Sequence, residues 1–206
     1  MEPVDLGLFP LEMVLVPGEQ IPLHLFEPRY RQLYADCVLS NTPFVLVRQE
    51  EGVAAQVGCT AVFEDLVSRE QDGRLNVIVR GAHAVEIIEE TQGRRYFSAL
   101  CRVLEDDAEA PDEALAQEAV RRFQEFSERL TGERRDPPEI DGVPLSYAIT
   151  GAMEMPTPIK QRILSLRNEP ARLTSVIRAI DIAQRSTDRI ELAAKRAKTN
   201  GKVSHP

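Results

Sequence analysis

The chain has 206 residues, of which 43% are hydrophobic, and a formal net charge of −8, so it is long enough for one domain with an appendage or for two small domains. An acidic body repels phosphates, which makes broad nucleic-acid binding unexpected. No apolar run approaches the roughly 20 residues of a membrane span, and the N-terminus lacks the basic and apolar regions of a secretory signal, so we expect a cytoplasmic protein without membrane contact.

The N-terminal segment, LGLFPLEMVLVPGEQIPLHLFEP, is rich in strand-forming residues and is broken by Pro10, Pro17-Gly18 and Pro22. It predicts short strands joined by tight turns, with Pro22 at a strand start or a sheet edge, where no N–H is needed for pairing. A helix is predicted from Pro28 to Leu39, since proline is tolerated in a first turn. The apolar residues of this helix recur on one face, at Tyr30, Leu33, Tyr34, Cys37 and Val38.

The next segment, from Pro43 to about Glu105, has the pattern of an antiparallel meander. Strands are predicted over 44–47, 57–67, 75–79, 85–88 and 96–104. Gly58 is a candidate bulge, Asp72-Gly73 predicts a hairpin turn because glycine tolerates positive φ, and Arg80-Gly81 separates two of the strands. This rhythm of short strands predicts a closed or half-closed β-barrel.

Helical periodicity follows an acidic linker. Asp112 is a candidate N-cap and Gly132 a candidate stop for the first helix. The apolar face of that helix is formed by Leu115, Ala119, Phe123, Phe126 and Leu130. Shorter helices are predicted over 145–153 and 159–166, the second opened by Thr157-Pro158 as N-cap and first turn, and a last helix starts near Glu169-Pro170.

Strands followed by helices predict an α+β fold rather than a doubly wound sheet. We expect a β-rich unit over residues 1–108, an α-helical bundle over 109–197 and a flexible tail over 198–206. From Arg185 to the C-terminus, six basic residues stand against two acidic ones. We interpret this segment as a solvated end, with contact to an acidic partner or to nucleic acid as the alternative.

Motifs of catalysis and of cofactor binding are missing from the sequence. It contains no GxxxxGK[ST], GxGxxG, HExxH or GxSxG run, and the widely spaced Cys37, Cys59 and Cys101 form neither a disulfide framework nor a CxxC pair. We therefore predict no catalytic residue, no cofactor and no metal. A small hydrolase or transferase that uses Cys59 and His83 on neighbouring strands stays an alternative.

The opening block resembles the N-terminal, substrate-binding domain of Lon-type ATP-dependent proteases. The resemblance rests on Leu8-Phe-Pro-Leu11, on Val16-Pro-Gly18 and on the run IPLHLFEPRYRQL from Ile21 to Leu33. Residues 57–58, 72–81, 96–106 and 170–173 are similar to later parts of the family's pattern, so the resemblance covers about residues 6–182.

The resemblance implies a PUA-like β pseudo-barrel followed by a helical bundle, in a region that contacts substrate polypeptides in full-length Lon proteases. The chain ends where the ATPase and protease domains would begin. We therefore expect a free-standing, non-catalytic adaptor or holdase-like factor that binds unfolded or apolar polypeptide segments. A separate ATPase or protease is a candidate partner, a monomer or weak homodimer is the expected assembly, and RNA binding through the PUA-like barrel is a weaker alternative.

A polypeptide-binding face needs exposed apolar groups with a polar rim. Between residues 21 and 25 the aliphatic side chains alternate toward the predicted core, which turns the residues between them outward. The candidate partner-binding residues are Pro22, His24, Phe26, Arg29 and Tyr30. Addition of an extended peptide to an exposed sheet edge is the alternative mode.

Overall fold

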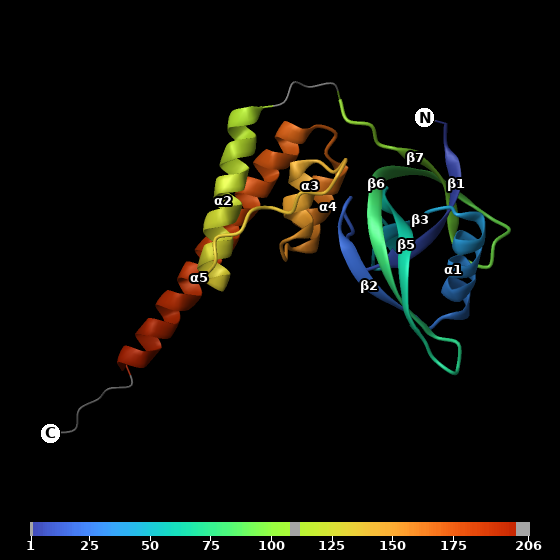
Figure 1. Ribbon diagram of the computed structural model, residues 1–206, viewed down its shortest axis with the longest axis horizontal. Helices are drawn as coiled ribbons and strands as arrows, with labels where there is room; N and C mark the ends of the chain where they lie inside the picture. The colour runs from blue at the N-terminus through green and yellow to red at the C-terminus, as the bar shows by residue number, and fades with distance from the viewer. Residues whose placement is uncertain (1, 108–111, 201–206) are drawn as a thin grey trace.

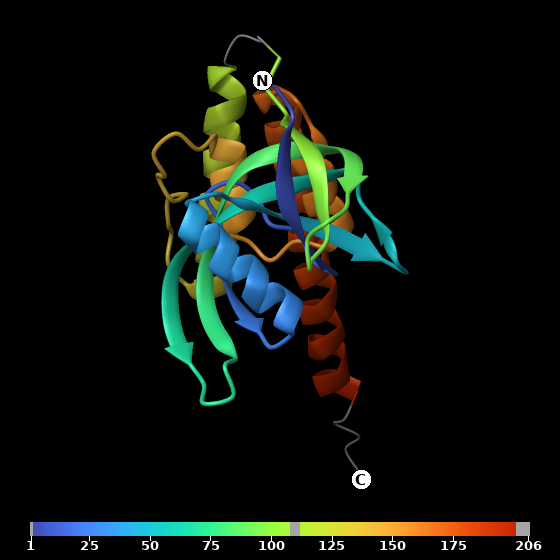
Figure 2. The same ribbon diagram turned by 90° about the vertical axis from the view of Figure 1, so that its right-hand side faces the viewer.

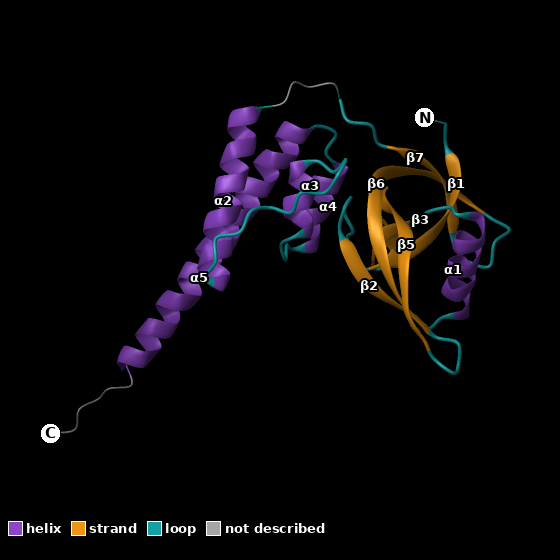
Figure 3. Cartoon of the chain, in the orientation of Figure 1, coloured by secondary structure: helices purple, strands orange, loops and turns teal. Residues whose placement is uncertain are grey.

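The computed structural model describes residues 2–107 and 112–200. In these ranges all strands come before the helices, except that one helix lies between the second and third strands (Figures 1 and 3). The strands are β1 (Val4–Leu11), β2 (Gln20–Leu25), β3 (Phe44–Glu50), β4 (Val53–Ala54), β5 (Val57–Arg69), β6 (Leu75–Thr91) and β7 (Ser98–Val103). The helices are α1 (Pro28–Ser40), α2 (Glu113–Thr131), α3 (Leu145–Gly151), α4 (Thr157–Ser165) and α5 (Glu169–Asn200). The predicted β-rich half followed by helices is confirmed. None of these helices, within the described ranges, combines the length and apolar character that crossing a membrane requires.

The strands close into a ring. β1 pairs antiparallel with β7 and parallel with β3, and antiparallel pairing continues from β7 through β6 and β5 back to β3. In Figure 2, α1 crosses in front of this ring. Among the described strands β2 pairs only with the first half of β6, so it keeps one free edge. Pro22 lies in this edge strand, where its missing N–H is tolerated, as predicted.

The β5–β6 hairpin turns at Asp72-Gly73 as predicted, but it differs from the prediction in two other ways. Gly58 pairs in regular register and is not a bulge; the first of three register irregularities between β5 and β6 lies just after it, where Thr60 faces two residues of β6, Ala82 and His83. The Thr60 hydroxyl accepts from the His83 N–H at 2.9 Å and donates to the His83 carbonyl at 3.2 Å. It thus satisfies backbone groups that a bulge leaves unpaired. Because the bulge bends β6 without ending it, β6 runs on as one strand of 17 residues.

The predicted helix over 28–39 is α1, with a narrower buried face than its sequence indicates. The buried residues of that face are Tyr30, Leu33 and Cys37. Val38 is 55% exposed, since each residue turns the chain by about 100° and carries Val38 off the buried stripe. Glu27 occupies the N-cap position without a side-chain hydrogen bond to the helix and pairs with Arg29 at 2.8 Å.

The helix ends in the second half follow the predicted caps closely. The Asp112 carboxylate accepts a hydrogen bond from the Leu115 N–H at 3.0 Å, and Gly132 ends α2 in the left-handed conformation. At α4 the N-cap is Pro156 rather than Thr157, which is the first helical residue. Local sequence signals therefore located both ends of α2, while the predicted N-cap of α4 is wrong by one residue.

Two ion pairs with buried members join the β-rich half to the helices. The Lys160 ammonium of α4 binds the Glu19 carboxylate from the loop before β2, and both side chains are 11% exposed. Burial raises the pKa of Glu19, and the Lys160 charge opposes that shift. Arg172 of α5 forms the second pair, with Asp106 after β7. One hydrophobic cluster extends from the ring of strands into α2–α5, and the exact boundaries of two separate units stay a prediction.

Candidate functional site

The outer face of β2 is exposed next to the helices. Burial alternates strictly along β2, with the aliphatic residues inside and Pro22 and His24 outside, as predicted. Phe26, directly after the strand, is 60% exposed. Figure 1 shows β2 on the side of the ring toward α3 and α4, and Gly151 of α3 lies against Glu19, directly before β2. We name the exposed side chains of Pro22, His24 and Phe26 the β2 face.

Polar groups border the β2 face across the sheet. The rings of His24 and Phe26 stack, with centroids 6.0 Å apart and planes 23° apart. The His24 Nδ1 lies 2.7 Å from the Asn76 Oδ1, and the Asn76 amide donates to the Ser68 hydroxyl at 2.9 Å. An apolar strip with a polar border is the arrangement expected of a protein-binding patch.

The structure does not bring all five predicted residues to this face. Tyr30 is only 6% exposed, because its ring stacks on Phe9 in the core with centroids 4.1 Å apart. The Arg29 guanidinium lies 4.6 Å from the centroid of the Tyr30 ring and 5.1 Å from that of Phe97. Tyr30 is therefore a core residue, which corrects the predicted patch, and Arg29 is held against the rings and Glu27. The alternation along the strand located the outward residues of β2, but it does not say which residues of the following helix α1 face the core.

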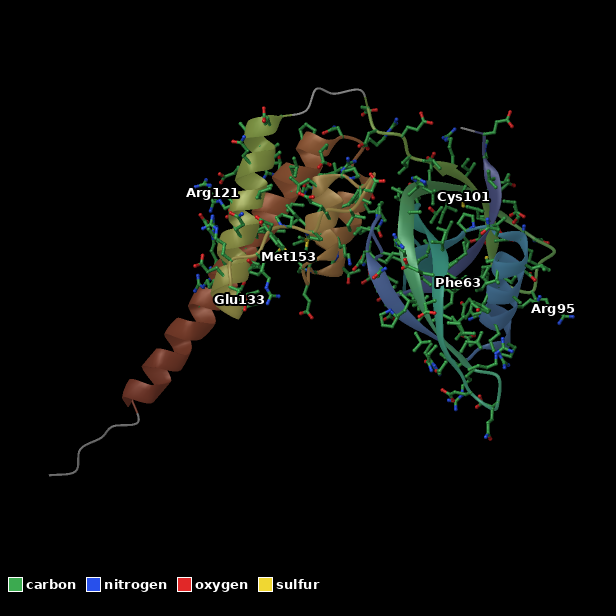
Figure 4. All side chains as sticks on the ribbon, in the orientation of Figure 1. Phe63, Arg95, Cys101, Arg121, Glu133 and Met153 are labelled. Atoms are coloured by element: carbon green, nitrogen blue, oxygen red, sulfur yellow. The ribbon has the colours of Figure 1, made fainter. Side chains whose placement is uncertain are left out.

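Sequence reasoning missed an apolar pocket at the C-terminal end of α2. The pocket has a volume of about 590 Å³ and is lined by Phe123, Phe126 and Leu130 of α2 and by Met153 after α3; Met153 is labelled in Figure 4. Leu130 is 57% exposed. The apolar stripe of α2 that continues to Leu130 was the available signal, but periodicity alone does not tell a covered stripe from an open one.

Cys59 and His83 do not form a reactive pair. Cys59 is fully buried, burial raises the pKa of its thiol far above the usual range, and the thiol donates to the Thr60 carbonyl at 3.3 Å. The His83 side chain is exposed at the bulge. Burial also raises the pKa of Cys37 and of Cys101 to about 11. Because the thiolate is the nucleophile, this geometry gives no support to the thiol-enzyme alternative.

We expect all three thiols to react slowly in the folded protein. At pH 8 the native chain should label with a thiol reagent at least about a hundredfold more slowly than the urea-unfolded chain, since burial blocks access and holds the thiols protonated. Quenched labelling followed by mass spectrometry measures this. A single cysteine that labels at the unfolded rate in the native protein would revive the enzyme alternative.

Comparisons with known proteins place the chain among domains of one kind. The family model of the ATP-dependent protease La (LON) substrate-binding domain matches residues 5–181. The crystal structure of a Lon N-terminal domain protein from Xanthomonas campestris has a TM-score of 0.66 and 21% identity, covering 84% of this chain and 97% of that one. The N-terminal domain of the Mycobacterium avium complex Lon protease has a TM-score of 0.69 and 19% identity, covering 86% and 98%. The comparison with curated proteins gives no match.

Proposed function

Because the chain belongs to the LON substrate-binding domain family, we propose that it binds unfolded or apolar polypeptide segments through the β2 face. The matched family is a substrate-binding domain and not the catalytic part of Lon. Binding without chemistry also agrees with the buried thiols. The function carried by the β2 face is to hold an extended segment by burying its apolar side chains.

The exposed ring of Phe26 is the observation that carries this proposal. Phe26 is 60% exposed, and contact of its ring with water is unfavourable. Full burial of a Phe side chain is favourable by about 1.5–3 kcal/mol, so a partner that covers the ring gains part of this free energy. Aromatic side chains dominate the energy of protein interfaces, and the stack on His24 limits the motion of the ring. Pro22 interrupts the row of N–H groups on the free edge of β2, which favours contact through side chains over strand addition.

The finer features implied by the family resemblance belong to the same proposal. They are a PUA-like pseudo-barrel with a helical bundle, a cytoplasmic location, and an adaptor or holdase-like role without catalysis. A separate ATPase or protease is the proposed recipient of the bound polypeptide. The pairing of Glu19 with Lys160 directly before β2 supports a rigid relation between the β2 face and the helices.

A titration with an unfolded polypeptide tests the proposal. The probe is reduced, carboxyamidomethylated lysozyme, which stays unfolded and carries a fluorescent label. We expect its fluorescence anisotropy to rise with a Kd on the order of micromolar, the range of transient recognition. Folded, unreduced lysozyme is the matched control and should not bind. If neither the unfolded nor the folded lysozyme binds at high protein concentration, the proposed function is wrong.

Replacing Phe26 with alanine is expected to weaken this binding about tenfold. Losing a partly buried aromatic contact costs about 1–2 kcal/mol, and about 1.4 kcal/mol corresponds to a factor of ten in Kd. Leu39→Ala is the control, because Leu39 is apolar, 89% exposed and on the last turn of α1. The β2 face is the wrong surface if both variants bind as the unchanged protein does.

A further inference from the structure

A second candidate binding surface lies in the helical half, where the segment over 132–144 connects α2 to α3. On one side of this segment is the pocket of Phe123, Phe126, Leu130 and Met153. On the other side is a cavity of about 680 Å³, lined by Val120 of α2, Leu145 of α3 and the segment itself. Asp136 and Pro138 line both cavities. We call the two together the α2 groove.

The segment that forms the α2 groove is held in place by side chains of α2. The Ser127 hydroxyl accepts a hydrogen bond from the Arg135 N–H at 3.0 Å and donates to the Gln124 carbonyl at 3.0 Å. The Gln124 amide also binds the Asp136 carboxylate. The walls of the groove are thus fixed in the absence of a partner, and such preorganisation lowers the cost of binding.

The rim of the α2 groove is acidic. Asp136, Glu139 and Asp141 line the first cavity and Glu154 lines the second. No lysine or arginine of the described residues forms an ion pair with any of these four carboxylates.

The arginines nearby are already engaged. Arg135, which also lines the second cavity, pairs with Glu133 at 2.6 Å. The Arg134 guanidinium donates to Oε1 of the Gln124 side chain at 2.6 Å and lies 3.9 Å from the Glu128 carboxylate. The ion pairs between described residues therefore leave these rim carboxylates without a basic partner, beside an apolar floor that includes the exposed Leu130.

We propose that the α2 groove binds a polypeptide segment that presents an apolar side chain next to lysine or arginine. This inference rests on the proposed function, because it names the class of segment that a polypeptide-binding chain prefers. The apolar side chain enters the floor of Phe126, Leu130 and Met153, and the neighbouring cations meet the rim carboxylates. Each exposed ion pair adds only a small amount of binding free energy, so we expect three of them together to tighten binding roughly fivefold or more at low salt, and the gain to shrink as salt is added.

Three fluorescent peptides test the charge preference. They share a Leu-Phe-Leu centre and are flanked on both sides by lysine, by glutamine or by glutamate. We expect the lysine peptide to bind at least roughly fivefold more tightly than the glutamine peptide at low salt, and the glutamate peptide to bind weakest. The acidic-rim variant carries Asp136→Asn, Glu139→Gln and Asp141→Asn and keeps only Glu154 of the rim carboxylates. It should lose most of the preference for the lysine peptide over the glutamine peptide, with the affinity of the glutamine peptide unchanged.

Two control variants locate the effect. The variant Glu51→Gln, Glu89→Gln, Glu90→Gln makes the same change in net charge at exposed carboxylates elsewhere, and it should keep the lysine preference. Phe26→Ala should also keep the preference, because the β2 face carries none of the rim carboxylates. Circular dichroism and the unfolding midpoint establish that each variant is folded.

The outcomes separate this inference from the proposed function. If lysine and glutamine peptides bind the unchanged protein equally, or if the acidic-rim variant keeps the full preference, the α2 groove is not selective and the inference is overturned while polypeptide binding stands. If no peptide and no unfolded polypeptide binds, the proposed function itself fails. If sedimentation shows a dimer that the acidic-rim variant loses, a second copy of the chain occupies the groove and the inference is also overturned.

Discussion

Replacing Arg172 with methionine is expected to lower the free energy of unfolding by about 3 kcal/mol, because it removes several charge-assisted hydrogen bonds of a buried guanidinium. Arg172 is fully buried. Its guanidinium donates to Asp106 at 2.6 Å, to Glu169 at 2.9 Å and to the Leu166 carbonyl at 3.1 Å. Its Nε also lies 3.0 Å from the Ser146 hydroxyl. Urea denaturation followed by circular dichroism measures the loss.

An exposed ion pair in the same region provides the control. Arg167 and Asp107 lie 3.2 Å apart, with side chains 54% and 60% exposed, so Arg167→Met should cost less than about 1 kcal/mol. Arg172→Lys should recover only part of the loss, since an ammonium cannot form the two parallel bonds of a guanidinium. Similar costs for Arg172→Met and Arg167→Met would show that the buried cluster does not join the two halves.

Replacing Gly81 with alanine is expected to destabilise the protein by about 2–3 kcal/mol, the upper part of the range found when a packed interior is overfilled. A Cβ at Gly81 would overlap the carbonyl oxygen of Val16 and lie 2.9 Å from its carbonyl carbon. The Gly81 N–H donates to the Glu19 carbonyl at 2.9 Å, and the Gly81 carbonyl accepts from the Gly18 N–H at 2.9 Å. Displacing this loop therefore also disturbs the pairing of Glu19 with Lys160.

Gly52 is the matched control for Gly81. It has a φ of 83° with nothing within 4 Å of an added Cβ, so Gly52→Ala tests backbone strain without a clash and should cost about 1–2 kcal/mol. Thermal and urea unfolding of both variants compares the cost of a steric clash at position 81 with the cost of backbone strain at position 52. If Gly81→Ala unfolds like the unchanged protein, the loop before β2 is not held against β6 as the structure has it.

Local signals in the sequence predicted the parts of the fold that depend on neighbouring residues. Asp112 and Gly132 mark the ends of α2 because a cap requires a side chain or a backbone conformation at one position. The alternation along β2 placed Pro22 and His24 outside because a strand has a period of two. These are short-range rules, and they gave the order of elements and the outward residues of the candidate site.

Long-range features escaped the sequence. The parallel pairing of β1 with β3 joins segments that are separated by β2 and α1, and no local pattern encodes such a pair. The bulge lies in β6 at Ala82 and His83, 23 residues along the chain from Thr60, whose hydroxyl stabilises it. The sequence around Gly58 therefore carries no signal for the position of this bulge. The burial of Arg172 contradicts the ordinary preference of arginine for the surface. Leu130 continues the apolar stripe of α2, yet it is 57% exposed.

The most direct test of the central claim is an amide-resolved NMR titration of the folded chain with the unfolded lysozyme. The account predicts shifts and broadening at His24, Phe26 and their neighbours on β6, with smaller changes along the α2 groove. The amides of α1 around Leu39 should stay unchanged. Perturbations that spare the β2 face and cluster elsewhere on the surface, or a spectrum that does not change at saturating polypeptide, would contradict it.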